Sequence, residues 1–284
     1  MRTDRHNEAP YPNAGSSQSN PFPIKISRIM NRELSIQMYS VRDEQTKDFS
    51  KTIRELAKIG FAGVELAGFG NLKSAAEVKK ACDDAGLLVT GMHVPLDRME
   101  SEIQKVAEES ILLGKALVIL PWLAEEKRQT ADDWKRIGTV LNHAGEALAT
   151  HGVELAYHNH SFEFEQFDGK TGLEILFAST DPLLVKAELD VYWVQHGGYD
   201  PVEFIEKFAT RLPAVHLKDM APGAEKRFAP AGTGILNFPK ILEACDKANV
   251  RWLVIEQDSC YDLQPLDAMK SAFDAIQKIP RTPR

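Results

Sequence analysis

Four short apolar runs of this chain each end in a side chain that can bind a metal ion. The four residues are His158 in V-E-L-A-Y-H, Asp190 in V-K-A-E-L-D, His216 in A-V-H-L and Glu256 in W-L-V-I-E. Imidazole nitrogens and carboxylate oxygens together suit one divalent ion, namely Mn, Mg, Co, Fe or Zn. A shell that the protein fills only in part would leave positions on the ion open to substrate oxygens.

The same run ends supply groups that can transfer a proton or stabilise charge. Glu256 and the two histidines of H-N-H, His158 and His160, are candidates for moving a proton. Lys218 lies two residues beyond His216, so both side chains share one side of an extended strand. Its ammonium is a candidate for polarising a carbonyl or holding an oxyanion.

Other side chains near run ends are candidates for contacting a hydroxyl-rich substrate. They are Gln37, Glu65, His93, Trp193 and Arg227. His93 is the favoured contact, whereas Gln37 and Glu65 serve equally well as satisfied polar residues of a barrel rim. Trp193 could stack on a ring or pack in the core, and Arg227 could bind an anionic substrate or be solvated.

Weaker signals follow two of the runs. Glu163 and Glu165 lie in the loop after H-N-H and are reserve ligands. The Gly-rich turn Pro230–Phe238 could cradle a phosphate, although a single Gly-x-Gly is little evidence for it. Trp122 and Phe69 are additional aromatic side chains that could stack on a substrate.

Only a repeated fold can bring these residues together. After Met30 the sequence alternates eight predicted buried strands with helical patterns. The predicted strands are Leu34–Tyr39, Gly63–Leu66, Leu87–His93, Ala116–Leu120, Val153–His158, Val185–Asp190, Ala214–Lys218 and Trp252–Glu256. Eight such units of about 25–38 residues predict an α/β fold, a (β/α)8 TIM barrel, in which all strand C-termini meet on one face. An open doubly wound sheet is the main alternative, but no G-x-G-x-x-G follows any strand.

Helix start and stop signals separate the strands. Asp48 is a predicted N-cap and Gly60 a predicted helix stop, while Ser74-Ala-Ala-Glu77 has the form of a capping box. Further helices are predicted after Thr130 and Asn237, and from Pro265.

Composition limits the classes of function. The chain has 284 residues, 43% of them hydrophobic, which is enough for one domain over residues 31–284. A net charge of −7 disfavours a nucleic-acid partner, and no apolar run approaches the roughly 20 residues of a membrane span. Three cysteines without CxxC spacing favour a reducing, cytoplasmic setting. Residues 1–30 are polar at first and predict a disordered extension, and Met30 is a candidate translation start.

Taken together, the motifs resemble the sugar phosphate isomerase/epimerase family of xylose-isomerase-like TIM barrels, over about residues 34–279. The motifs that carry the resemblance are I-Q-M-Y-S-V-R-D-E, G-V-E-L-A-G, M-H-V-P, A-Y-H-N-H-S-F-E-F, E-L-D-V-Y-W-V-Q-H-G-G-Y-D-P, V-H-L-K-D and L-V-I-E-Q-D. Epimerases of this family bind one divalent ion through Glu, Asp, His and Glu at the ends of strands five to eight. The resemblance transfers the last three ligands to Asp190, His216 and Glu256. His158 stands where the strand-five glutamate is expected, and Trp193 replaces a frequent histidine.

The resemblance implies a divalent-metal-dependent sugar isomerase or epimerase that acts through an enediolate next to a carbonyl. A lyase that eliminates from 3-keto-glycosides is the alternative. The H-N-H of strand five resembles that of some family members which carry out this elimination. A non-catalytic sugar-binding barrel and an apurinic endonuclease are further alternatives, the latter disfavoured by the acidic charge. The expected partner is a small sugar or keto-sugar substrate, and the family suggests a homodimer.

Overall fold

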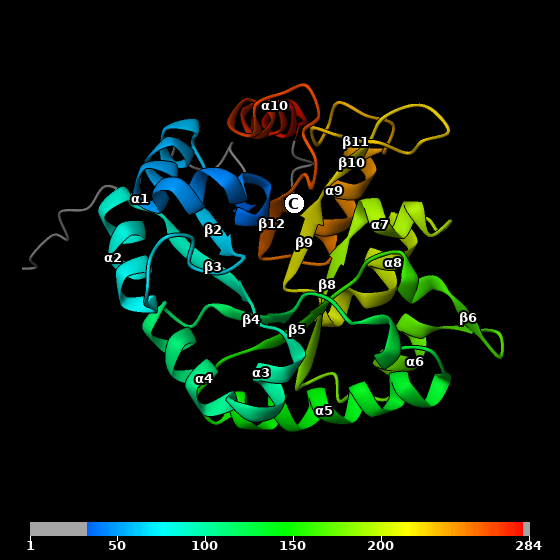
Figure 1. Ribbon diagram of the computed structural model, residues 1–284. Coiled ribbons are helices and arrows are strands. Elements are labelled where there is room, and N and C mark those ends of the chain that lie inside the picture. The colour runs from blue at the N-terminus through cyan, green and yellow to red at the C-terminus, as the bar shows by residue number, and fades with distance from the viewer. Residues whose placement is uncertain (1–32, 281–284) are drawn as a thin grey trace, which may run out of the picture. The chain divides into compact units, whose positions relative to one another are not determined.

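The computed structural model describes residues 33–280, and the predicted extension over residues 1–30 lies outside the described residues. Eight parallel strands close into a barrel in the order β1-β12-β9-β8-β5-β4-β3-β2 (Figure 1). The strands are β1 (Leu34–Gln37), β2 (Gly63–Leu66), β3 (Leu88–His93), β4 (Leu117–Leu120), β5 (Leu155–His158), β8 (Val185–Asp190), β9 (Ala214–Leu217) and β12 (Trp252–Ile255). The predicted TIM barrel is therefore confirmed.

Helices surround the barrel strands, as Figure 1 shows. They are α1 (Arg42–Ile59), α2 (Ala75–Ala85), α3 (Leu96–Ser101), α4 (Ile103–Leu112), α5 (Ala131–Ala149), α6 (Gly172–Ala178), α7 (Val191–His196), α8 (Pro201–Phe208), α9 (Phe238–Lys247) and α10 (Pro265–Lys278). Within residues 33–280, no helix is both long and apolar enough to cross a membrane.

Two small antiparallel hairpins, which the sequence analysis did not predict, lie in the loops after β5 and β9. They are β6 (Gln166–Phe167) with β7 (Lys170–Thr171), and β10 (Asp219–Met220) with β11 (Phe228–Ala229). Both follow strands that carry site residues, so they shape the face of the barrel where those strands end.

The predicted helix signals operate locally, with two refinements. Asp48 has non-helical backbone angles inside α1 and caps the second part of that helix, because its Oδ1 accepts from the Lys51 N–H at 2.9 Å. Gly60 ends the helix with φ +118°, a conformation that suits glycine. Ser74 caps α2 by accepting from the Glu77 N–H, but the Glu77 carboxylate bonds to Lys73 N rather than to Ser74 N. The cap is therefore present without the reciprocal bond of a capping box.

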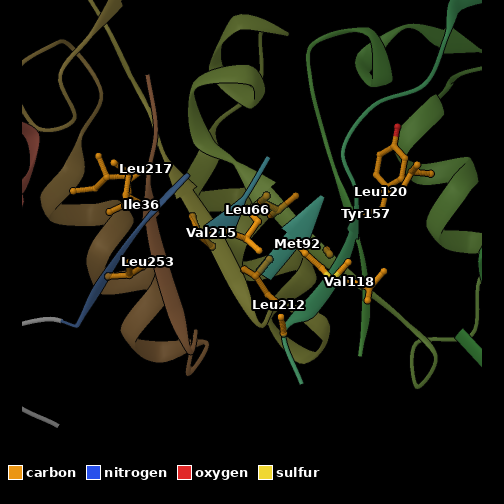
Figure 2. Close-up of a cluster of buried hydrophobic side chains, with 14 of the residues drawn as sticks. Ile36, Leu66, Met92, Val118, Leu120, Tyr157, Leu212, Val215, Leu217 and Leu253 are labelled. Carbon is orange, nitrogen blue, oxygen red and sulfur yellow. The ribbon is translucent and has the colours of Figure 1, made fainter. Parts of the chain in front are cut away.

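Side chains of one strand alternate between the helices and the barrel interior. Val118 and Leu120 belong to the large core that packs under the helices, and Figure 2 shows them among its side chains. Leu117 and Ile119 alternate with them and belong to a separate small cluster inside the barrel. The other buried members of that cluster are Ala156, Ala214 and Val254. The barrel interior is therefore filled by these apolar side chains together with Ser35 and Thr90, whose hydroxyls lie 2.7 Å apart.

Candidate metal centre

A layer of polar side chains lies next to the apolar cluster, nearer the C-terminal ends of the strands. His158, His216 and Glu256 each lie two residues beyond a member of that cluster, so alternation points them into the barrel. Asp190 ends β8, and its backbone pairs with that of His216 in the neighbouring β9. One donor atom from each of His158, Asp190, His216 and Glu256 lies within 4.8 Å of the other three. The structure thus brings together the four residues that the sequence analysis selected.

His216 has one ring nitrogen in this donor set and the other against a supporting layer. Its Nδ1 lies 2.7 Å from Glu256 Oε2, whereas its Nε2 lies 2.8 Å from Glu65 Oε1 and 3.3 Å from Glu188 Oε2. A metal-binding histidine commonly donates its second ring N–H to a carboxylate, which fixes the ring orientation. Glu65 is placed to accept that bond, and Glu188 adds a second negative charge beside the same nitrogen.

The supporting layer is itself hydrogen-bonded. Glu65 Oε1 accepts from Gln37 Nε2 at 2.7 Å and lies 3.0 Å from His93 Nε2. Glu65, His93, Glu188 and His216 form a second cluster with donor atoms within 4.8 Å. Because His216 belongs to both clusters and its Nε2 is directed at these carboxylates, we interpret the second cluster as support for the first.

Burial keeps two of the histidines neutral. Burial, followed by the charge of His216, lowers the pKa of His158 well below its usual value. Burial and the Lys218 ammonium lower the pKa of His160 to about 3. A neutral imidazole can bind a metal ion or accept a proton, and an imidazolium can do neither.

Positive charge gathers where the carboxylates face one another. Burial by itself would lower the pKa of His216 and of Lys218, but neighbouring carboxylates outweigh it and raise both well above their usual values. Burial opposes ionisation of Glu256, yet the charge of Lys218 and the hydrogen bond with His216 hold the pKa of Glu256 well below its usual value. The carboxylates of the cluster therefore stabilise positive charge at His216 and Lys218.

Buried polar atoms without hydrogen-bond partners also indicate a cation site here. Within the described part of the chain, no hydrogen bond reaches His158 Nδ1, Asp190 Oδ2 or either carboxylate oxygen of Glu188. Asp190 Oδ2 has two ion-pair neighbours, the Lys218 ammonium at 3.0 Å and His158 Nε2 at 4.0 Å. Buried polar atoms are rarely left without a partner, so these atoms indicate a ligand site. Two nitrogen and two oxygen donors suit Mn, Co, Fe or Zn, with Mg less well served by imidazole.

The loop after β5 positions His160. Its backbone N–H donates to Glu163 Oε2 at 2.8 Å, and Tyr157 donates its hydroxyl to Glu163 Oε1 at 2.8 Å. Asn159 Oδ1 accepts from the Asp190 N–H at 3.0 Å and joins the ends of β5 and β8. Glu163 is thus a buried support for the loop, while Glu165 is exposed.

A pocket of about 360 Å³ adjoins the donor set, because His158 and Glu256 belong to both. It is lined by Tyr39, His93, Pro121, Trp122, His158, His160, Glu256 and Asp258. Trp122 and Tyr39 are the most exposed of these, at 53% and 44%, and could provide apolar faces for a ring. The pocket therefore combines proton-transfer groups with aromatic side chains.

Four predicted substrate contacts lie outside this lining. Gln37 and Glu65 are buried beneath it in the supporting layer. Trp193 packs against His160, with ring centroids 5.4 Å apart. Arg227 is exposed and stacks on the ring of Tyr261 at 3.8 Å.

The Gly-rich turn wraps around a carboxylate of the chain itself. Asp219 Oδ2 accepts from the N–H groups of Gly232 and Gly234, at 3.0 and 2.7 Å. Asp219 Oδ1 accepts from Met220 and Leu236, at 2.7 and 3.1 Å. These donors are already satisfied, so they do not supply the phosphate cradle that the turn suggested.

Sequence reasoning did not select Glu188 or Asp258, although a signal for both was present. Each lies two residues from a selected ligand, Glu188 before Asp190 and Asp258 after Glu256. Strand alternation alone would have assigned both to the inner side of the barrel.

Comparison with known proteins places these features in context. A family model described as xylose isomerase-like TIM barrel matches residues 53–279. The chain is 37% identical over 227 residues to an inosose dehydratase of Geobacillus kaustophilus (strain HTA426), covering 71% of this chain and 70% of that protein. A sugar phosphate isomerase/epimerase structure from Parabacteroides distasonis ATCC 8503 has a TM-score of 0.78 at 24% identity, covering 91% of this chain and 97% of that one. D-Psicose 3-epimerase with D-tagatose, from Clostridium cellulolyticum H10, has a TM-score of 0.65 at 15% identity, covering 87% and 99%. The last two likenesses show the fold.

Proposed function

Because this chain belongs to the xylose isomerase-like TIM barrel family, we propose that it is a metal-dependent enzyme acting beside a carbonyl group of a keto-sugar or keto-cyclitol. The observation that carries the proposal is the convergence of His158, Asp190, His216 and Glu256 beside a pocket that His158 and Glu256 line. When bound, a divalent ion would polarise the substrate carbonyl and lower the pKa of the neighbouring C–H. Those four residues would hold it.

The chain's own residues provide the proton transfers. His158 and His160 are neutral, both line the pocket, and their ring centroids are 5.1 Å apart. One imidazole accepts the proton from the carbon beside the carbonyl. Trp122 and Tyr39 orient the ring of the substrate from the pocket mouth.

Elimination of water is the outcome that we favour. The C–H bond beside the carbonyl breaks, a C=C bond forms, and the C–O bond at the next carbon breaks. The imidazolium formed by the first step donates that proton to the departing hydroxyl, which leaves as water and returns the imidazole to its neutral form. The similarity to an inosose dehydratase at 37% identity supports this outcome. Replacement of the expected strand-five glutamate by His158 also supports it, because two-base epimerisation uses two carboxylates.

Isomerisation or epimerisation is the second candidate and shares the first step. It is supported by Glu256, which reaches the pocket from the end of β12 while His158 reaches it from β5. These strands are not neighbours in the barrel, so two proton-transfer groups approach the pocket from separate directions.

Metal content tests the site before any substrate is known. Elemental analysis after incubation with Mn²⁺, Co²⁺ or Zn²⁺ should find about one ion per chain, with loss of the ion in His158→Ala and Glu256→Ala. His151→Ala, at an exposed position after α5, is the matched control. Loss only in Glu256→Ala would reassign His158 to proton transfer alone. A wild-type chain that holds none of these ions would refute the metal-dependent proposal.

Product analysis then separates the two reactions. The loaded enzyme is given inosose, a 3-keto-glucoside and D-tagatose in separate assays. Elimination produces an unsaturated ketone that absorbs in the ultraviolet, whereas isomerisation or epimerisation produces a new sugar without that absorbance. His160→Gln should slow turnover by about 10²–10⁴-fold while the metal content stays unchanged.

A further inference from the structure

A lysine ammonium lies inside the candidate metal centre. Lys218 follows β9 and its side chain is 1% exposed. Its Nζ lies 3.0 Å from Asp190 Oδ2, 3.0 Å from Glu256 Oε2 and 2.9 Å from Asp258 Oδ1. A buried cation is thus shared among three carboxylates.

Two of the three carboxylates are also the acidic members of the donor set. Asp190 and Glu256 belong to it, whereas Asp258 does not. Asp258 lines the pocket, and its side chain is 22% exposed. A divalent cation and the Lys218 ammonium therefore need the same two carboxylates, and their like charges repel at this distance.

Charge balance indicates how both cations can be accommodated. The two negative charges of Asp190 and Glu256 balance one divalent ion. The single positive charge of Lys218 is then balanced only by Asp258. Buried charges are tolerated when each has a partner, so a loaded site needs the Lys218 ammonium to remain with Asp258.

We propose that Asp258 is a docking carboxylate that draws the Lys218 ammonium away from Asp190 and Glu256 and so allows a divalent cation to bind them. Asp258 is a positioning residue in this scheme, because it acts through Lys218. The scheme rests on the proposed metal centre and adds a competing internal cation to it. The scheme also gives a reason for the Asp258 carboxylate, which lies beside Lys218 but outside the donor set.

The test measures binding of Mn²⁺ alone to the full chain, with free Mn²⁺ followed by electron paramagnetic resonance. Asp258→Asn removes the docking charge, so Lys218 is left to Asp190 and Glu256, and Mn²⁺ affinity should fall by about 10–100-fold. Asp258→Glu keeps the charge, so its Mn²⁺ affinity should stay within about threefold of the wild-type value. Asp262→Asn, on the exposed loop before α10, is the matched control.

A double-mutant cycle distinguishes docking from a direct attraction between Asp258 and the ion. Lys218→Met removes the competing cation and should tighten Mn²⁺ binding. In that background, Asp258→Asn should change the affinity by less than about threefold, because Asp258 has no ammonium left to hold. Circular dichroism of each variant is the control for folding. Equal losses from Asp258→Asn with and without Lys218 would overturn the docking role and leave the metal centre intact.

The wild-type measurement separates this inference from the proposed function. If wild type binds no Mn²⁺ but Lys218→Met binds it, Lys218 holds the site permanently, and both docking and the metal-dependent function are refuted. If Asp258→Glu binds as weakly as Asp258→Asn, the charge of the carboxylate is not what matters, and only the docking role is refuted.

Discussion

Asp219→Asn should destabilise the fold strongly, although the substitution changes little in shape. The Asp219 carboxylate accepts four backbone N–H groups, two on each oxygen. An amide keeps one oxygen and turns the other position into an NH₂ group that faces two N–H donors. Two charge-assisted hydrogen bonds are lost, each worth about 1.5–3 kcal/mol, so the free energy of unfolding should fall by about 3–6 kcal/mol. A typical domain has only about 5–15 kcal/mol in total.

Urea unfolding followed by far-ultraviolet circular dichroism measures this loss. Asp262→Asn, at an exposed position, is the control and should change the free energy of unfolding by less than about 0.5 kcal/mol. The turn at 230–236 should also become more susceptible to proteolysis, because its backbone loses its anchor. A loss below about 1 kcal/mol for Asp219→Asn would refute the reasoning, since it would mean that water satisfies these N–H groups equally well.

Two further predictions concern Glu163 and Gly91. Burial, opposed by the hydrogen bond from Tyr157, raises the pKa of Glu163 from 4.5 to about 8, so its contribution to stability is complete below pH 4.5 and is lost as the pH rises through 8. Glu163→Gln should therefore flatten the decline in free energy of unfolding between pH 5 and 8. Urea unfolding at several pH values measures this decline, and a decline as steep as in wild type would contradict the prediction. A methyl group at Gly91 would lie 2.7 Å from Ile119 Cδ1 and 2.8 Å from Glu65 Oε2, so Gly91→Ala should cost about 1–3 kcal/mol and weaken Mn²⁺ binding. Unchanged thermal unfolding and Mn²⁺ affinity would show that the barrel interior has room to adjust.

The barrel itself could be predicted because its signals are local and repeated. Each strand is a short apolar run, and the caps at Asp48 and Thr130 depend on neighbouring residues alone. The four-residue donor set could also be predicted, since parallel strands with a common register deliver their C-terminal residues to one face. Because the strand–helix unit repeats, local patterns were enough to predict that residues far apart in the sequence converge.

The partners of those residues could not be predicted in the same way. Glu65 is separated from His216 by 151 positions, and Arg42 bonds to Asp258 O across 216 positions. Which ring nitrogen of His216 meets Glu256 depends on the side-chain rotamer, which no sequence pattern specifies. The turn after hairpin β10–β11 is held by the Asp219 carboxylate, which accepts three of its N–H groups and that of Met220 in β10.

The sequence by itself determined the alternation of eight strands with helices, several helix caps and the four residues of the donor set, because propensity and alternation act over a few residues. Only the tertiary structure decided how charge is shared among those residues. It buried Lys218 between Asp190, Glu256 and Asp258, and it removed water from around His158 and His160. Charge and burial are properties of everything that surrounds a group in space, and closure of the barrel is what creates those surroundings.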